Sequence, residues 1–538
     1  MSSGRKRAAS SSKEDGSSEQ GTKRTIKWTK QFSHAGPRFQ PDYIPINGTK
    51  PLFRYNGEPL ALTANAEEVA VMYARYLCGK RREKNIEKML QQNFFQDWQK
   101  SMNGKEKKII EKFELCDFSG FVKKLQEDKE KPVTKQERAA QKKKREEMMT
   151  QYKTVIVDGR KELVGNFTVE PPGLYMGRGN NKKIGHVKKR INPEDVTINC
   201  DEQHIPKAPG NSKWRAIVHD RTVMWLASWY DEITKSTKYI QLHCSSKIKN
   251  DIEEEKFERV SELKKQINDV RRQYESDLKS KDDETRQKAT AVYLIDKFAL
   301  RAGNEKPEGA TDTVGCCSLR VEHLSLLASK KIQLNFLGKD SIRYEKDLLV
   351  SQAVYDNLQD FRTKDFEGKK KMKNDFLFEL IKTQSVNEYL GRRMEGLTAK
   401  VFRTFRATQH FEEKLNEYSK SHKLKTTKGT PEDDKMKLIV FKRANLAVAE
   451  LLNHQTLSKP SGKGKPKAIM KLESRIKDAQ SQLKSLSNGT DEYRKQTAKL
   501  EVLTQDLDLK VKQRTFALGT SKINYIDPNV SAEWSVST

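Results

Sequence analysis

The chain of 538 residues carries 104 Lys and Arg against 74 Asp and Glu, a formal net charge of +30, and only 35% of its residues are hydrophobic. This cationic excess favours a polyanionic partner, for which nucleic acid is the usual choice. The composition and motifs exclude several classes: no apolar run approaches the about 18 residues of a membrane span, no secretory segment or GxxxxGK[ST] phosphate loop is found, and the six cysteines form no CxxC pair that would indicate a zinc knuckle.

The first 27 residues are rich in Ser, Gly, Lys and Glu, with almost nothing apolar to bury. We therefore expect residues 1–27 to be a disordered tail. Arg5-Lys6-Arg7 predicts a short nuclear import signal. A mitochondrial presequence fits less well, because Glu14 and Asp15 intervene and no amphipathic apolar face is present.

Residues 28–246 have the pattern of a mixed α/β region. A helical period opens at Ala66, the segment Asn93–Trp98 supplies aromatic core candidates, and strand-like runs such as Tyr152–Val157 and Val223–Ala227 fall within 151–245. Residues 132–150 have no apolar stripe and predict a charged, solvent-exposed helix. For any single lysine a solvated face is the simpler interpretation, whereas the cluster as a whole favours a basic arm near DNA.

Residues 247–457 return to a helical period. Between 252 and 300 one helix face carries a regular apolar series, and Val292–Leu300 is apolar enough to be buried. The members of the series are Phe257, Val260, Leu263, Ile267, Val270 and Tyr274.

Residues 458–514 contain the clearest periodicity in the chain. Apolar residues recur at alternating steps of three and four, then a turn follows at Ser487–Thr490, and a second apolar series continues at helical spacing. The two series are Ile469, Leu472, Ile476, Ala479, Leu483 and Leu486, then Tyr493, Leu500, Leu503 and Leu507. Two short arms around a tight turn favour an antiparallel coiled-coil hairpin over an oligomerisation coil. A flexible entrance is expected at Pro460–Pro466, and the hairpin would return Tyr525 beside the residues that precede it.

The segment Ser521–Tyr525 introduces a possible nucleophile. A tyrosine oxygen can attack a phosphodiester and hold the strand covalently, so that cutting and resealing need no ATP. Because the phenol has a reference pKa near 10, it needs cationic help. Guanidinium groups can bind the non-bridging oxygens, and a lysine near other cations can protonate the departing 5′ oxygen. One tyrosine among 16 is weak evidence by itself.

Upstream segments supply such cations in order. The buried helix is expected to end at the glycine of Leu300–Lys306, which places Arg301 beside a helix C-terminus. Phe336–Ser341 has the pattern of a strand that runs into a turn, from which Lys339 can project. Lys400 and Arg403 lie three apart, which places them on one helical face, and His454 closes an apolar helix. Each of these residues alone is more often an ordinary surface or helix-end residue. The order in which all of them occur along the chain, ending with Tyr525, is a specific signal of this chemistry.

These segments together resemble eukaryotic DNA topoisomerase I, the type IB family. The likeness runs from about Trp28 to Trp534 and is close over 300–306, 313–323, 336–344, 394–404 and 519–528. It implies that Tyr525 forms a 3′-phosphotyrosine, that Lys339 is the general acid, and that the non-bridging oxygens are held by Arg301, Arg403 and His454. Strand rotation and religation would then relax positive and negative supercoils without ATP, metal or another cofactor.

The resemblance also implies a fold and partners. The fold is an α+β multidomain DNA clamp: a mixed α/β cap (28–246), a mainly helical catalytic lobe related to tyrosine recombinases (247–457), the coiled-coil linker (458–514) and a short segment bearing the tyrosine (515–538). Duplex DNA is expected to be bound by a monomer, mainly through phosphates. The expected DNA-binding residues are Arg178, Lys188, Lys238, Tyr239, Lys400, Asp340 and Asn524.

Camptothecin-class inhibitors bind the cleaved family complex near positions that match Arg178, Asp340 and Asn524, so sensitivity is expected. The nucleus is the expected location, with the mitochondrion as the alternative. A tyrosine recombinase and a non-catalytic DNA or chromatin protein are the competing hypotheses. The clamp-like N-terminal region and the coiled-coil linker argue against the first, and the second would gain nothing from Tyr525 or Lys339.

Three departures from the family pattern are noted. The tail before Trp28 is short, which affects import and partner binding. Asn181 stands where the family usually has histidine, so one local DNA contact is expected to change. The chain stops at Thr538, soon after Tyr525, and looser packing around the tyrosine is therefore expected.

Overall fold

The computed structural model describes residues 26–46, 50–79, 83–130, 134–304, 311–422, 431–456 and 466–537. The import signal Arg5-Lys6-Arg7, all but the last two residues of the expected tail, and all but the last residue of the expected entrance Pro460–Pro466 lie outside these ranges. The described residues form two compact units: those between 12 and 254, with Thr311, make up one, and those between 255 and 538, apart from Thr311, make up the other. None of the described helices is both long and apolar enough to cross a membrane.

The unit of residues 12–254 contains small sheets, as the strand-rich pattern predicts. One is the antiparallel set β1-β5-β6 (Phe32–His34, Thr154–Val157 and Arg160–Leu163). A second has the order β10-β9-β11-β12 (Ala216–Val218, Val196–Asn199, Trp225–Asp231 and Ser236–Gln241), with β10 parallel to β9. Two smaller sheets are β3-β2-β4 (Glu58–Pro59, Arg54–Tyr55 and Cys116–Asp117) and β7-β8 (Gly173–Leu174 and Val187–Lys188).

The same unit has a helical part built on aromatic packing. Its helices are α1 (Ala64–Leu77), α2 (Lys84–Ser101), α3 (Gly104–Ile109) and α4 (Ser119–Glu130). Phe94 and Trp98 on α2 are fully buried, and the Trp98 indole donates to the Ala66 carbonyl at 2.8 Å, which fixes α2 against α1. The predicted aromatic core and the helix at Ala66 are thus confirmed.

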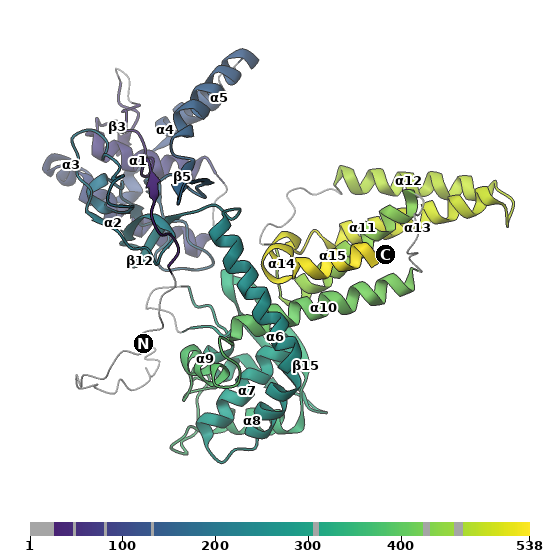
Figure 1. The fold of residues 1–538 in the computed structure, drawn as a ribbon. Helices are drawn as coiled ribbons and strands as arrows, with labels where there is room; N and C mark the ends of the chain where they lie inside the picture. Colours follow the sequence, from purple (N-terminus) through teal and green to yellow (C-terminus); the bar gives the residue numbers. More distant parts are fainter. Residues whose placement is uncertain are drawn as a thin grey trace. The chain divides into compact units, whose positions relative to one another are not determined.

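Helix α5 (Lys135–Thr150) is exposed along nearly its whole length and reaches away from the rest of its unit (Figure 1). Its start is fixed by a capping box, in which Thr134 accepts from the Glu137 amide and the Glu137 carboxylate accepts from the Thr134 amide. This confirms the charged, solvent-exposed helix that the sequence predicts.

The other unit is mainly helical and encloses one three-stranded sheet. Helix α6 (Lys247–Asp277) begins in the first unit and enters this one at Glu255; all six members of its predicted apolar series are buried. The sheet has the order β13-β14-β15 (Leu324–Leu326, Lys331–Leu337 and Arg343–Leu349), all antiparallel. The remaining helices are α7 (Asp283–Phe298), α8 (Gln352–Thr363), α9 (Thr383–Gly391), α10 (Ala399–Ser421), α11 (Pro431–Leu451), α14 (Leu518–Tyr525) and α15 (Pro528–Ser537).

The predicted hairpin forms as α12 (Lys467–Lys484) and α13 (Asp491–Lys512), which run side by side (Figure 1). Leu472, Ala479 and Leu503 are buried between the two helices. The Gln496 amide donates to the Ala479 carbonyl at 3.0 Å, and Thr490 caps the second helix. The Gln496 amide also donates to the Gln482 side-chain oxygen at 2.8 Å. Apolar packing, these cross-helix hydrogen bonds and a capped turn therefore close this hairpin on itself.

The end of α7 differs from the prediction. The helix ends at Phe298, and its C-cap is Ala299 in the left-handed conformation (φ 51°) rather than a glycine. Gly303 (φ 77°) instead lies against the backbone of Gly315: a Cβ on Gly303 would come within 2.4 Å of the Gly315 Cα. This approach allows the Cys316 amide to donate to the Arg301 carbonyl at 2.8 Å. Arg301 still lies just past the helix, three residues after Phe298, but tertiary contacts determine its place.

The contact at Gly303 can be tested with a matched pair of substitutions. Gly303→Ala adds a backbone clash to the cost of a left-handed alanine, so we expect it to lower the free energy of unfolding by about 3 kcal/mol or more. Gly368 has a similar φ of 82° but open space around its Cβ position. Gly368→Ala should therefore cost only about 1–2 kcal/mol. Thermal and urea unfolding of both variants measure this, and equal losses would show that the close approach carries no cost.

Candidate active site

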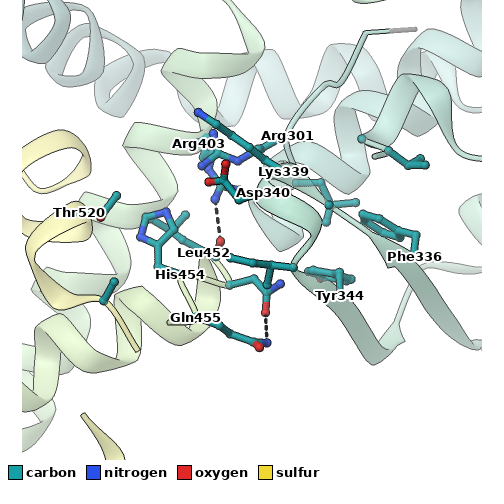
Figure 2. A pocket seen from close by; sticks show the side chains of 17 residues that line it. Arg301, Phe336, Lys339, Asp340, Tyr344, Arg403, Leu452, His454, Gln455 and Thr520 are labelled. Atoms are coloured by element: carbon teal, nitrogen blue, oxygen red, sulfur yellow. Dashed lines mark hydrogen bonds between the residues drawn. The ribbon is translucent and has the colours of Figure 1, made fainter. Parts of the chain in front are cut away.

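Four of the five predicted catalytic residues line one pocket of the mainly helical unit (Figure 2). Arg301 follows α7, Lys339 follows β14, Arg403 lies on α10, and His454 follows α11. Tyr525, the fifth, ends α14, and its hydroxyl accepts a hydrogen bond from Arg301 Nη1 at 3.2 Å. The structure thus brings together residues that the sequence separates by more than two hundred positions.

Tyr525 is held tightly. Its side chain is only 8% exposed, and the Thr408 hydroxyl donates to its backbone carbonyl at 3.0 Å. Ile526 is buried beside it, and Trp534 on α15 packs on the same cluster and donates to the Ser419 hydroxyl at 2.9 Å. The expectation of looser packing around the tyrosine is therefore wrong, because α15 and α10 enclose it.

The environment of Tyr525 favours its ionised form. Burial raises the pKa of the phenol, but the charges of Arg403 and Arg301, together with the hydrogen bond from Arg301, outweigh this effect. The net result is a pKa below the usual value of a tyrosine. The Arg403 guanidinium carbon lies 5.4 Å from the centre of the tyrosine ring. The two cations therefore stabilise the phenolate form of this side chain.

Arg403 is the most constrained cation of the site. It is 5% exposed and donates to two backbone carbonyls, those of Ala299 and, at 2.7 Å, Leu452, the second of which is drawn in Figure 2. These carbonyls lie at the C-terminal ends of α7 and α11, where helix dipoles place partial negative charge. Burial and the neighbouring Arg301 lower the pKa of Arg403 to about 10, so that it stays charged at neutral pH.

His454 is buried and neutral. Its exposure is 6%, and Nδ1 lies 2.8 Å from the Ser521 hydroxyl oxygen, whereas Nε2 has no protein partner among the described residues. Burial, then the charges of Arg403, Arg301 and Lys339, lower the pKa of His454 to about 3. At neutral pH the ring therefore carries one proton, on one of its two nitrogens.

Lys339 stands at the tip of the β14–β15 hairpin, as predicted. The strands pair from Lys331–Leu349 to Leu337–Arg343, and the Gly338 amide donates to the Ile342 carbonyl at 2.8 Å to close the loop. Lys339 is exposed. Its amine therefore extends from the rigid support of a paired hairpin.

Three of the predicted DNA-binding residues lie in this unit. Asp340 lines the pocket, and Asn524 is exposed beside Tyr525 on α14, where its carbonyl accepts from Lys256 Nζ at 3.0 Å. Lys400 is exposed, whereas Arg403 one turn later is buried. Placing both on one helical face was therefore too simple: residues three apart are offset by about 60° around the axis, and the edge of the buried face runs between them.

The other four lie in the first unit. Arg178 is exposed, and so is Tyr239, whose ring leans on Trp225 with centroids 5.8 Å apart. Lys188 pairs with Glu170 at 2.8 Å, and Lys238 pairs with Asp231 at 3.5 Å. A phosphate contact by either lysine would compete with its carboxylate partner.

Asn181 is used inside the protein. Its side chain is 6% exposed, donates to the Thr311 hydroxyl at 3.1 Å and accepts from the Lys183 amide at 2.9 Å. In this state the amide stabilises the local loop. The predicted change in a DNA contact at this position stays a prediction.

Two residues of the site were not assigned roles from the sequence. Ser521, which contacts His454, lies four residues before Tyr525 on α14, and this spacing could have placed both on one helix face. Tyr344 lines the pocket from β15 and stacks on Phe336 with centroids 5.1 Å apart. Nothing in the sequence distinguishes Tyr344 from other buried tyrosines. Among the described residues, no group of three or more His, Cys, Asp or Glu side chains is placed to hold a metal ion.

Comparison with known proteins covers almost the whole chain. Residues 26–242 match the family described as eukaryotic DNA topoisomerase I, DNA binding fragment; residues 245–490 match eukaryotic DNA topoisomerase I, catalytic core; and residues 497–538 match a C-terminal topoisomerase domain. DNA topoisomerase 1 of Homo sapiens is 39% identical over 544 residues, which cover 95% of this chain and 68% of the human protein. The chain belongs to the eukaryotic DNA topoisomerase I family.

Other relatives of this topoisomerase family support the assignment. DNA topoisomerase 1 of Caenorhabditis elegans is 40% identical over 95% of this chain and 64% of its own length. The mitochondrial DNA topoisomerase I of Rattus norvegicus is 38% identical over 95% of this chain and 88% of its own length. The chain thus spans about two thirds of the nematode and human proteins and most of the rat mitochondrial one. The resemblance to the type IB family, whose activity is to relax supercoiled DNA, is confirmed.

Proposed function

We propose that this chain relaxes supercoiled DNA by cutting and resealing one strand through Tyr525, without ATP or a metal ion. The observation that carries the proposal is the buried tyrosine whose hydroxyl accepts from Arg301 while Arg403 lies over its ring. A packing tyrosine would gain nothing from two neighbouring guanidinium groups, whereas a nucleophile needs them to ionise.

In the cleavage step the Tyr525 oxygen attacks phosphorus as the bond between phosphorus and the 5′ oxygen breaks. The products are a 3′-phosphotyrosine and a 5′-hydroxyl. The bonding electron pair leaves with the 5′ oxygen, and Lys339 supplies its proton. An exposed lysine on a hairpin tip suits this role, because it can reach the leaving group of a strand that lies over the pocket.

Charge that develops on the non-bridging oxygens is met by Arg301, Arg403 and His454. Arg403 is held in place by the Ala299 and Leu452 carbonyls, so its side chain needs little reorganisation when the phosphate binds. His454 contributes a neutral donor through Nε2, the ring nitrogen that has no partner among the described residues. Removal of one such donor typically slows a reaction about 10²–10³-fold.

Religation is the reverse reaction. The 5′-hydroxyl attacks the phosphotyrosine, its proton returns to Lys339, and Tyr525 leaves as the phenolate that the two arginines stabilise. Because one phosphodiester replaces another, the bond energy is kept. Rotation of the free strand between the two steps relaxes positive and negative supercoils alike.

The proposed fold is the family's DNA clamp, with a cap over 28–246, a catalytic lobe related to tyrosine recombinases and a coiled-coil linker. The net charge of +30 and the exposed basic helix α5 support binding to duplex DNA mainly through phosphates. Binding by a monomer, camptothecin sensitivity through Arg178, Asp340 and Asn524, and nuclear location are proposed with it. Because one similar relative is named as mitochondrial, the mitochondrion is the alternative location.

The nucleophile is tested by Tyr525→Phe. We expect the wild type to relax plasmids of both supercoil signs in EDTA without ATP and to give a covalent adduct when stopped with detergent. Tyr525→Phe should bind DNA normally but lose relaxation and the adduct altogether. The matched control is Tyr344→Phe, another buried tyrosine of the same site, which should keep both. An adduct in Tyr525→Phe would contradict the assignment.

The general acid is tested by changing the leaving group. Lys339→Ala should slow single-turnover cleavage of an ordinary oligonucleotide duplex by about 10²–10⁴-fold. A duplex in which sulfur replaces the bridging 5′ oxygen has a leaving group that needs no proton. Lys339→Ala should cleave that duplex nearly as fast as the wild type does. Equal loss on both duplexes would mean that Lys339 binds the strand rather than protonates it.

A further inference from the structure

We propose that Ser521 is a positioning residue for His454: its hydroxyl donates to Nδ1 and so directs an Nε2–H toward the phosphate oxygen. The proposal rests on the proposed function of the Tyr525 site. It adds a residue to that site and explains how a neutral histidine presents a donor rather than a lone pair.

The geometry places the hydroxyl where it can control the ring. Ser521 is fully buried, and its oxygen lies 2.8 Å from His454 Nδ1, its hydrogen-bond partner in the described structure. On the other side of the ring, Nε2 is buried without a partner, although the ring centre lies 5.4 Å from that of Tyr525. One nitrogen is therefore satisfied by the protein, and the other is left for a ligand at the tyrosine.

The charges around the ring decide which nitrogen carries the proton. Tyr525 also faces the ring, but the charges that act on it are those of Arg403, Arg301 and Lys339, all cationic, so the ring itself stays neutral and has a single N–H. If Nδ1 carried that proton, Nε2 would present a lone pair to an anionic phosphate oxygen and repel it. If Ser521 donates to Nδ1, the proton lies on Nε2, where it can be donated to that oxygen.

The backbone supports this arrangement from both sides. The Ala517 amide donates to the His454 carbonyl at 2.7 Å, and the Thr456 amide donates to the Thr515 carbonyl at 2.9 Å. These bonds hold the start of α14 against the segment that bears the histidine. Ser521 and Tyr525 then lie one turn apart on α14, so that a single helix seats the nucleophile and orients the histidine.

A double-mutant cycle separates this role from simple packing. We expect Ser521→Ala to slow single-turnover cleavage about 10-fold, as is usual when the orienting partner of a histidine is lost. Ser521→Thr, which keeps the hydroxyl, should restore most of the rate. In a His454→Ala background, Ser521→Ala should change the rate by less than about 2-fold, because its only effect passes through the ring.

Three outcomes would overturn the proposal. The first is a cleavage rate that Ser521→Ala leaves unchanged in the wild-type background, and the second is a further loss of about 10-fold in that rate in the His454→Ala background. The third is a Ser521→Thr variant that does not regain the rate although its Tm matches that of the wild type. A second readout does not depend on activity. In protein labelled with ¹⁵N-histidine, the His454 signals, assigned by their loss in His454→Ala, should show a protonated Nε2 in the wild type and a mixture of tautomers in Ser521→Ala. A protonated Nδ1 in the wild type would refute the inference, whether or not the chain is active. Inactivity of the wild type alone would count only against the proposed function.

Discussion

The site depends on one buried cation, the guanidinium of Arg403, held by the carbonyl groups that end two helices. A charge with 5% exposure would be costly if it were unpaired, but the Ala299 and Leu452 carbonyls provide acceptors where helix dipoles add negative potential. The left-handed C-cap at Ala299 turns one of these carbonyls toward the arginine. This arrangement therefore positions together the ends of α7 and α11, Arg301, which is two residues after Ala299, and the nearby His454.

The same positive field acts on two groups of opposite kind. It lowers the pKa of Tyr525 against the effect of burial, which favours the phenolate, and it adds to burial in lowering the pKa of His454 to about 3, which keeps that ring neutral. One arrangement of fixed cations thus favours an ionised phenol and leaves a neutral ring beside it. Because Arg301 and Arg403 are in place before DNA binds, little of this organisation has to form during the reaction.

Periodicity and turn chemistry predicted much of the fold. The apolar series on α6, the α12–α13 hairpin, the exposed α5 and the strand that leads to Lys339 were all visible as spacings in the sequence. What could not be predicted depends on contacts between distant segments. The left-handed Ala299 and the burial of Arg403 follow from packing of α7, α10 and α11, which no local pattern encodes. The five site residues could be ordered, and their convergence expected, only through resemblance to a family.

The most direct test of the central claim is the ionisation of Tyr525 itself, measured as the difference in phenolate absorbance between the wild type and Tyr525→Phe during a pH titration. We expect a single phenol that ionises below the usual tyrosine pKa of about 10, with a midpoint that rises in Arg301→Met because a charge and a hydrogen bond are lost. A midpoint at or above that value in the wild type would mean that burial outweighs the two arginines, and it would contradict the claim that the site prepares the nucleophile.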